Sequence, residues 1–194
     1  PLSYPLVIKT FRSAFGKSPD DIFDSFSKSA VNAASIGQVH KATLGDKTLA
    51  VKIQYPGVAT SVSSDLKMVK PIAMRMLNLN EIELDQYMEE VHDKLLEETD
   101  YELEVSRSIQ ISEACGHIKG LKFPKYYPEL SSDRIIIMDW LEGNHIKEFL
   151  ATSPSQKVLD AVGQAMWDFY HYQIHDLFEV HADPHPGNFI LTGE

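Results

Sequence analysis

Apolar residues near the start of the chain recur at helical spacing. In residues 3–16 they are three or four positions apart, which predicts a helix that Gly16 ends. Ser18 then precedes a proline and two acids, the composition of a helix start, so a second short helix is expected. Its apolar residues are expected in the core: Ile22, Phe23 and Phe26.

The pattern changes to strict alternation after a run of small residues. Residues 39–43 and 49–53 alternate along the chain on either side of a Gly45-Asp46 turn, which predicts a β-hairpin. The small residues at 29–35 precede this hairpin and predict a loop.

Two long helical patterns follow the hairpin. Residues 58–77 read as a helix, and Pro71 within it predicts a kink or break near Val69. Residues 83–115 read as one longer helix with an apolar stripe and a solvated acidic face. The methionines of the first helix are expected in the core: Met68, Met74 and Met76.

The second half mixes short strands with helices. Residues 121–127 predict a short strand, and the continuous apolar run 134–138 predicts a strand in the centre of a sheet. A glycine turn near 143 is the natural domain boundary. A short helix near 145–150, a long helix over 156–175 and a strand at 189–191 are expected after it. The buried side of the long helix is predicted from its apolar residues: Val158, Leu159, Val162, Met166, Phe169, Tyr170 and Ile174.

Composition narrows the class of protein. The chain has 194 residues, 43% of them hydrophobic, with a formal net charge of −10, which argues against nucleic acid as the main partner. A single cysteine rules out an internal disulfide and favours a reducing, intracellular location. No apolar run approaches the about 18 residues of a membrane helix, and no signal peptide is seen. The chain begins without Met, so both ends are expected to continue in a longer protein.

The loop from His181 to Asn188 carries the strongest candidate chemistry. Kinase-type phosphotransferases need a carboxylate aimed at the attacking hydroxyl and, five positions later, an Asn that binds a phosphate-bridging metal. Asp183 and Asn188 have that spacing, with two prolines and a glycine between them. The alternative is an ordinary turn with two polar turn-forming residues.

Lys52 supplies a second part of such a site. It follows Leu49-Ala50-Val51 in the hairpin, fifteen residues after Gly37, as the phosphate-contacting lysine does in kinases. Gly37 and Val39 match the last Gly and the Val of the kinase G-x-G-x-x-G-x-V loop, whereas other residues replace the first two glycines. The alternative is a solvent-facing strand lysine. Glu98 and Asp100 are singled out as candidate acidic partners of Lys52, although spacing alone does not identify the partner.

With these parts in order, the chain resembles the UbiB/ADCK family of atypical, protein-kinase-like proteins. Four segments match its motifs from residue 29 onward: the alanine-rich loop Ala33–His40, the lysine strand Val51–Val58, the E-x-D motif Glu98–Asp100 and the catalytic loop His181–Asn188. The resemblance implies an α+β, two-lobe kinase-like fold. It implies a helical extension over 1–26, an N-lobe over 27–142 and a partial C-lobe over 143–194.

The resemblance also implies site residues and cofactors. ATP or ADP with Mg²⁺ would be bound, with Lys52 and Asp183 as catalytic residues and Asn188 as metal ligand. The remaining nucleotide-binding residues would be Ala33, Ala34, Ser35, Gly37, Gln38, Glu98 and Asp100. Because alanine restricts the backbone more than glycine, slow phosphoryl transfer is expected. The implied role supports isoprenoid-quinone (ubiquinone) biosynthesis. The implied partners are an isoprenoid lipid, quinone-biosynthesis proteins or a membrane surface, for a cytoplasmic or membrane-peripheral protein.

Three departures from the family pattern stand out. The K-x-G-Q segment that should precede the alanine-rich loop is absent, as is the D-F-G segment that should follow residues 189–191. Asn32 stands where a third alanine is usual. Since the D-F-G Asp is the main metal ligand of kinases, this stretch carries only part of a metal site.

Three other functions compete with a kinase-like ATPase. One is a non-catalytic scaffold that binds nucleotide or lipid. A second is a small-molecule kinase of the aminoglycoside or choline type, which shares the H-x-D-x-x-x-x-N loop. The third is a metal-dependent hydrolase, suggested by a group of possible ligands: His171, His175, His181, Asp183 and His185.

Overall fold

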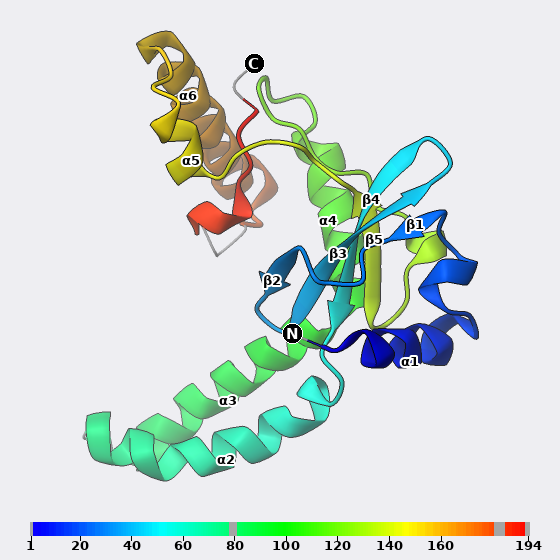
Figure 1. The fold of residues 1–194 in the computed structure, drawn as a ribbon. Coiled ribbons are helices and arrows are strands. Elements are labelled where there is room, and N and C mark those ends of the chain that lie inside the picture. The colour runs from blue at the N-terminus through cyan, green and yellow to red at the C-terminus, as the bar shows by residue number, and fades with distance from the viewer. Residues whose placement is uncertain (1, 78–80, 181–184, 193–194) are drawn as a thin grey trace. The chain divides into compact units, whose positions relative to one another are not determined.

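The computed structural model describes residues 2–77, 81–180 and 185–192. The chain divides into two compact units. The first comprises Pro1–Arg107 and Tyr126–Asp139, and the second Ser108–Lys125 and Trp140–Glu194. Strands and long helices are both present, as the predicted α+β class requires (Figure 1). The predicted limits at 26 and 142 remain predictions.

The first unit is built on an antiparallel sheet. Its strands are β1 (Ser25–Phe26), β2 (Asn32–Ala34), β3 (Gly37–Leu44), β4 (Lys47–Gln54) and β5 (Ile135–Asp139). The order is β1-β3-β4-β5, and β2 also pairs with β3. The predicted hairpin is therefore β3–β4, and its turn holds Gly45 in the left-handed region at φ 62°. The small-residue run is not all loop, because residues 32–34 form a strand that folds back onto β3.

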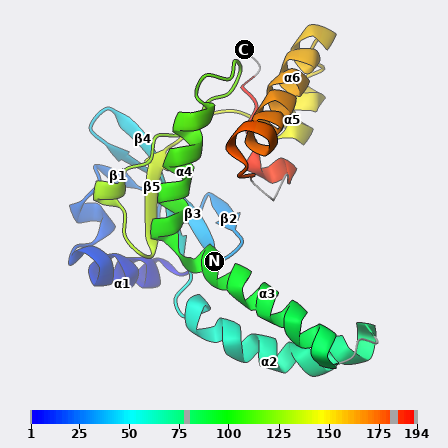
Figure 2. The same cartoon turned by 180° about the vertical axis from the view of Figure 1, so that it is seen from behind.

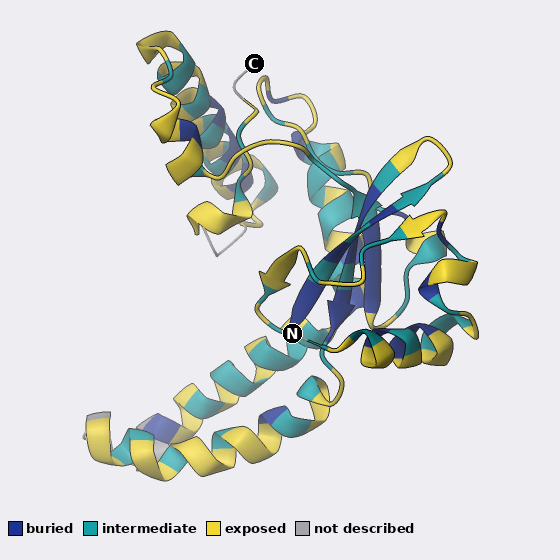
Figure 3. Ribbon diagram, viewed as in Figure 1, coloured by how far each residue is buried: buried dark blue, intermediate teal, exposed yellow. Residues whose placement is uncertain are grey.

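One face of this sheet is covered by helix α1 (Tyr4–Phe15). Val7 and Phe11 of the helix pack with Leu49, Val51 and Ile53 of β4, and all five are fully buried (Figure 3). The N–H of Gly16 caps the helix by donating to the Arg12 carbonyl, with φ at 70° as predicted for a glycine stop.

The expected second helix is a single 3₁₀ turn, Pro19–Asp21. Asp21 accepts hydrogen bonds from the backbone N–H and the hydroxyl of Ser18, which fixes the start of this turn. Phe23 is buried in the α1 core, and Phe26 packs against it, as predicted.

Strand β5 differs from its prediction in position. It was expected in the sheet centre, yet it is the last strand in the order. Ile135, Ile136 and Ile137 are nevertheless buried. Ile135 and Ile137 belong to the core cluster that contains α1 residues and Tyr127, which lies beside the edge of β5. The expected strand at 121–127 is reduced to a bridge from Tyr126 to Met138 and a hydrogen bond from the Tyr127 N–H to the Ile137 carbonyl.

Helices α2 (Val58–Leu77) and α3 (Glu81–Thr99) form a hairpin (Figures 1 and 2). Pro71 does not break α2, which runs continuously through it. The core prediction for its methionines is wrong: Met68 is 73% exposed and Met76 is 80% exposed. Among the described residues, α3 is the main element packed along α2, so much of the α2 surface stays exposed.

The predicted helix over 83–115 is two helices. α3 ends at Thr99 and α4 (Tyr101–Cys115) begins after Asp100. The Asp100 carboxylate accepts a hydrogen bond from the Leu103 N–H at 2.9 Å, which is the geometry of a helix N-cap. This local capping bond restarts the helix and separates the two segments.

The second unit is helical. Its main elements are α5 (Ile146–Ala151) and α6 (Gln156–Tyr172), followed by a π-helical turn at Gln173–Leu177. Phe169 of α6 packs with Cys115 and Ile118 in its core. Ile174, predicted on the buried side, is 50% exposed because the regular helix ends before it.

The expected strand at 189–191 is also reduced. A 3₁₀ turn occupies Pro186–Asn188, and Leu191 makes only an antiparallel bridge with Asn144. Among the described residues, no helix is both long and apolar enough to cross a membrane.

Candidate nucleotide site

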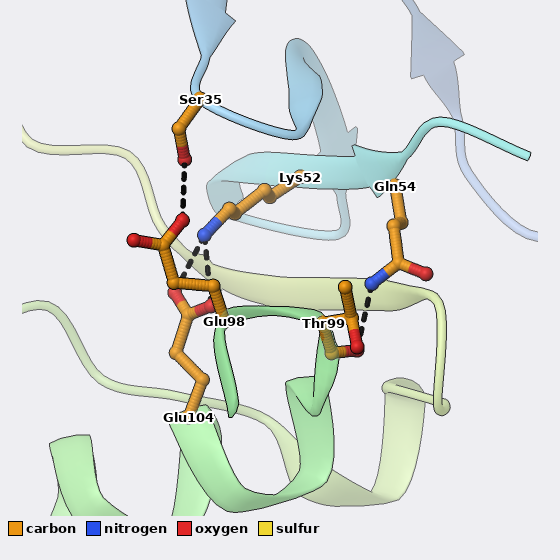
Figure 4. A network of polar contacts seen from close by, with 6 residues as sticks. All are labelled: Ser35, Lys52, Gln54, Glu98, Thr99 and Glu104. Atoms are coloured by element: carbon orange, nitrogen blue, oxygen red, sulfur yellow. Dashed lines mark hydrogen bonds and ion pairs between the residues drawn. The ribbon is translucent and has the colours of Figure 1, made fainter. Parts of the chain in front are cut away.

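The centre of the candidate site is an ion pair between Lys52 and Glu104. The Lys52 Nζ donates to both carboxylate oxygens of Glu104, at 2.7 and 2.8 Å (Figure 4). The lysine side chain is 16% exposed and the glutamate 34%. A two-oxygen contact at these distances is a charge-assisted bond, stronger than a neutral one.

The alternation of β4 explains why Lys52 lies here. Val51 and Ile53 point into the α1 core, so Lys52 and Gln54 point to the opposite face. On that face the Gln54 amide donates to the Thr99 carbonyl at 2.7 Å and ties β4 to the end of α3 (Figure 4). The first turns of α4 then present Glu104 to the lysine.

The preferred partners of Lys52, Glu98 and Asp100, are not its partner. Asp100 caps α4, and Glu98 accepts a hydrogen bond from the Ser35 hydroxyl at 3.3 Å. Helical spacing indicates Glu104 only once the start of α4 at Tyr101 is known. Residues one turn after Tyr101 then lie on the same face of the helix as Tyr101. Tyr101 and Val105 are buried, which places Glu104 on the same side.

The alanine-rich segment forms a tight hairpin with its turn at Ser35 and Ile36. Ala33 and Ala34 lie in β2, opposite Gln38 and Gly37 of β3. Ala33 and Ser35 are exposed, so this turn presents small side chains and backbone to solvent. The Ser35 hydroxyl ties this turn to α3 through its hydrogen bond to Glu98 (Figure 4).

Gly37 has a packing reason to be glycine. A Cβ there would fall well inside contact distance of the Ile53 carbonyl oxygen and 2.9 Å from the Tyr101 hydroxyl oxygen. Its neighbour Gln38 is paired with Ile53 across the sheet and therefore shares the α1 face, away from Lys52. Gln38 is 1% exposed and hydrogen-bonds His40. The side chain predicted to bind nucleotide is thus buried on the other face.

Tyr101, the first residue of α4, lies next to Lys52 and Gly37 and was not predicted as a site residue. It is fully buried, and Lys52 Nζ sits 4.8 Å from its ring centroid, within cation–π range. Burial raises the pKa of its hydroxyl above the usual range, and the nearby Glu104 carboxylate raises it further. Among the described residues, the hydroxyl has no hydrogen-bond partner, a condition that costs about 1–3 kcal/mol.

The comparisons with known proteins agree with this geometry. A family model described as the ABC1 atypical kinase-like domain matches residues 1–194. The chain belongs to the ABC1 atypical kinase-like family. The resemblance to UbiB/ADCK proteins is thereby confirmed.

Individual relatives extend well beyond this chain. The AarF domain-containing protein kinase 1 of Xenopus tropicalis is 29% identical over 97% of the chain and 36% of its own length. AarF domain-containing kinase 1 of Drosophila melanogaster is 31% identical over 94% of the chain and 36% of its own length. The chain thus spans about a third of these relatives.

A solved structure supports the kinase-like fold. The erythromycin complex of Rv3197 from Mycobacterium tuberculosis has a TM-score of 0.79 and 28% identity, and covers 99% of the chain and 49% of that protein. Together with the antiparallel sheet and long helices, this confirms the predicted kinase-like α+β class.

The predicted catalytic loop is only partly described. Asp183 and His181 lie outside the described residues. Asn188 ends the 3₁₀ turn, where its N–H donates to the His185 carbonyl at 2.9 Å, and its side chain is exposed. The ring centroids of His171 and His175 are 4.4 Å apart. Within residues 2–77, 81–180 and 185–192, no three His, Cys, Asp or Glu side chains are grouped as a metal site requires.

The residues of the first unit fit the phosphates of a nucleotide. ATP with Mg²⁺ is the general ligand of kinase-like domains. Lys52 offers a cation, the exposed turn at Ser35 offers a hydroxyl and backbone N–H groups, and a buried Tyr101 hydroxyl is unpartnered. All are donors, and phosphate oxygens only accept. Asn188 carries an amide oxygen, a ligand type that Mg²⁺ takes.

Proposed function

We propose that this chain is the nucleotide-binding part of an atypical kinase that binds ATP or ADP with Mg²⁺ and turns over slowly. The observation that supports it best is the Lys52–Glu104 ion pair on the face of β4 opposite the α1 core. In kinases, a lysine held by a helix glutamate contacts the nucleotide phosphates. A surface lysine without such a role would extend into solvent, whereas Lys52 is 16% exposed.

The geometry of the lysine suits an anionic ligand. An ammonium group has three N–H donors, and Glu104 takes two of the available directions. Because the pair is half-buried, solvent screens its charges less than those of exposed pairs. The ammonium is therefore held in one place, ready to receive phosphate oxygens without a large ordering cost.

Slow turnover follows from the alanine-rich hairpin. Asn32 and Ala34 carry Cβ atoms where kinases use glycine, and their backbone is fixed by pairing with β3. The backbone N–H groups therefore approach the phosphates less closely than in a glycine-rich loop. Weaker hold on the transferred phosphoryl group predicts a low rate of transfer or hydrolysis.

The remaining roles belong to the loop after α6. Asp183 would accept the proton of the attacking hydroxyl or water, and Asn188 would hold Mg²⁺. Bound Mg²⁺ bridges phosphate oxygens and neutralises their developing charge. Since the chain spans a third of its relatives, the wider role is also a proposal: support of isoprenoid-quinone synthesis, with an isoprenoid lipid, quinone-biosynthesis proteins or a membrane surface as partners.

Thermal unfolding with and without Mg-ATP or Mg-ADP tests nucleotide binding. Ligand at a hundred times its Kd should stabilise the chain by about 2.7 kcal/mol, and Lys52→Ala should abolish this shift. Lys47→Ala is the matched control, because Lys47 lies on the same strand but contacts the Tyr127 ring, 4.5 Å away. No nucleotide shift in the wild-type chain would contradict the proposal.

Steady-state ATP hydrolysis separates the enzyme from a non-catalytic scaffold. Asp183→Asn should keep the nucleotide-induced stabilisation and lose turnover, with Asp176→Asn on the exposed π-helical turn as the control. A wild-type chain that binds nucleotide but shows no turnover above Asp183→Asn would favour the scaffold.

A further inference from the structure

The hydroxyl of Tyr101 is the one polar atom near Lys52 that the described contacts leave unexplained. Tyr101 is fully buried at the start of α4, and its hydroxyl oxygen has no hydrogen-bond partner among the described residues. A phenylalanine would fill the same space without burying an unsatisfied donor. A buried hydroxyl without a partner among the described residues therefore indicates a partner from outside the chain.

The position of the hydroxyl indicates where that partner would come from. Lys52 Nζ lies 4.8 Å above the ring, and the hydroxyl oxygen lies directly under Gly37, 2.9 Å from where a Cβ would stand. Glu104 is close enough to affect the hydroxyl yet accepts no hydrogen bond from it. The Tyr101 ring therefore lies against Lys52, and its hydroxyl lies against Gly37 in the alanine-rich hairpin.

The part of the chain next to the Tyr101 hydroxyl has small side chains. Gly37 has no side chain, and the adjoining turn holds exposed Ser35. The Ser35 hydroxyl donates to Glu98 of α3 at 3.3 Å, at the long end of hydrogen-bond distances, and the Ile36 carbonyl accepts from the Tyr55 N–H at 2.9 Å. A ligand held by Lys52 would meet the hydroxyl at the base of this hairpin, next to Gly37.

We propose that the Tyr101 hydroxyl donates a hydrogen bond to a phosphate oxygen of the nucleotide bound at Lys52. This inference rests on the proposed function and adds a binding residue to it. The hydroxyl acts as a donor, because burial and Glu104 both favour its protonated form. Phosphate oxygens are acceptors, so the pairing is complementary, and the ring holds the Lys52 ammonium beside the same oxygens.

The test is calorimetric titration of Mg-ADP into the wild-type chain and Tyr101→Phe, which removes only the hydroxyl. We expect an affinity about tenfold lower in Tyr101→Phe, because a hydrogen bond to a charged acceptor is lost. The ligand-free variant should melt at the same temperature as the wild type or higher, since a buried unpaired donor is gone. A merely structural role predicts the opposite, a lower melting temperature.

Two further arms locate the contact. Magnesium pyrophosphate, which lacks base and ribose, should show the same fold-loss in Tyr101→Phe, and adenosine should show none. Tyr4→Phe is the matched control, because Tyr4 packs in the α1 core with its hydroxyl donating to Asp20, on the face of the sheet opposite Lys52, and it should bind Mg-ADP as the wild type does.

The outcomes separate this inference from the proposed function. If the wild-type chain binds Mg-ADP and Tyr101→Phe binds it equally well, the inference is wrong and the proposed function stands. If the loss appears with adenosine rather than pyrophosphate, the contact is not to phosphate and the inference is again wrong. If the wild-type chain binds no nucleotide, both are overturned.

Discussion

Acidification should destabilise the first unit through His40. This histidine is fully buried on β3, with its Nδ1 2.6 Å from the Ser27 carbonyl oxygen and its Nε2 2.8 Å from the Gln38 amide nitrogen. The Gln38 amide oxygen accepts from the Leu2 N–H at 2.6 Å. Because a carbonyl only accepts, Nδ1 must carry the proton and Nε2 must accept from Gln38. The chain of bonds is therefore satisfied only by neutral His40.

Protonation breaks this chain. A second proton on Nε2 would face the Gln38 amide hydrogens, and turning the amide over would set its hydrogens against the Leu2 N–H. Burial lowers the pKa of His40, and this outweighs the opposing effect of the Ser27 carbonyl. The unfolded chain, with a pKa of about 6.5, then binds more protons than the folded one.

The sign and size of the effect follow from linkage. A folded pKa below the unfolded value gives stability that is complete above about pH 6.5 and falls as the pH drops below it. If folded His40 stays neutral, the free energy of unfolding falls by at most about 1.3 kcal/mol between pH 7 and 5.5. The average slope is below the limiting value of about 1.4 kcal/mol per pH unit, because the unfolded histidine is only partly protonated near pH 6.5.

Urea unfolding of the wild type and His40→Phe across this pH range measures the effect. Phenylalanine keeps the stacking against Phe26, whose ring centroid is 4.9 Å away, and removes the titration. Circular dichroism is the suitable signal, because Trp140 and Trp167 both lie in the second unit. His40→Phe should be less stable at pH 7, and the gap should narrow by up to about 1 kcal/mol at pH 5.5. A constant or widening gap would refute the reasoning.

Two further substitutions test the packing and the helix cap that position the candidate site. Gly37→Ala should lower the melting temperature by the equivalent of about 1–3 kcal/mol, because its Cβ would press on the Ile53 carbonyl and the Tyr101 hydroxyl. Gly163→Ala, in α6 with nothing within 4 Å, is the control and should stabilise by up to about 1 kcal/mol; equal effects would contradict the packing argument. Asp100→Ala should cost about 0.5–2 kcal/mol in urea unfolding through loss of the α4 cap, whereas Asp100→Asn should cost little, and a full-sized loss in Asp100→Asn would argue against capping.

The sequence was most informative where a local period and a turn coincide. Alternation on both sides of Gly45 located the β3–β4 hairpin and, within it, Lys52 on the face away from the core. The acidic partner of Lys52 could not be predicted from the same pattern. Helical periodicity continues through Asp100, so the restart that brings Glu104 to Lys52 depends on one capping bond that the pattern does not register.

Burial was predicted less well where it depends on what packs against an element. Met68 and Met76 have core-like spacing, but in the described part of the chain α2 packs mainly along α3, and both side chains are exposed. β5 has the composition of a central strand, and it is buried at the end of the sheet because Tyr126 and Tyr127 run beside its edge. Both results depend on neighbouring elements, which sequence periodicity does not specify.

The alanine-rich motif divides into structural and exposed parts. Gly37 occupies the position of a phosphate-loop glycine, yet the nearness of Ile53 and Tyr101 is enough to require it. Gln38 points to the face opposite Lys52, where it hydrogen-bonds His40 and accepts from the N–H of Leu2, just before α1. Within Ala33–His40 the exposed residues are Ala33 and Ser35, whereas Gly37 is buried between its strand partners Ala34 and Gln54. Matching a motif residue by residue assigns one function to all its positions, but a strand sends neighbours to opposite faces. Under the proposed function, only the positions on the Lys52 face, or at the exposed turn, would contact the nucleotide.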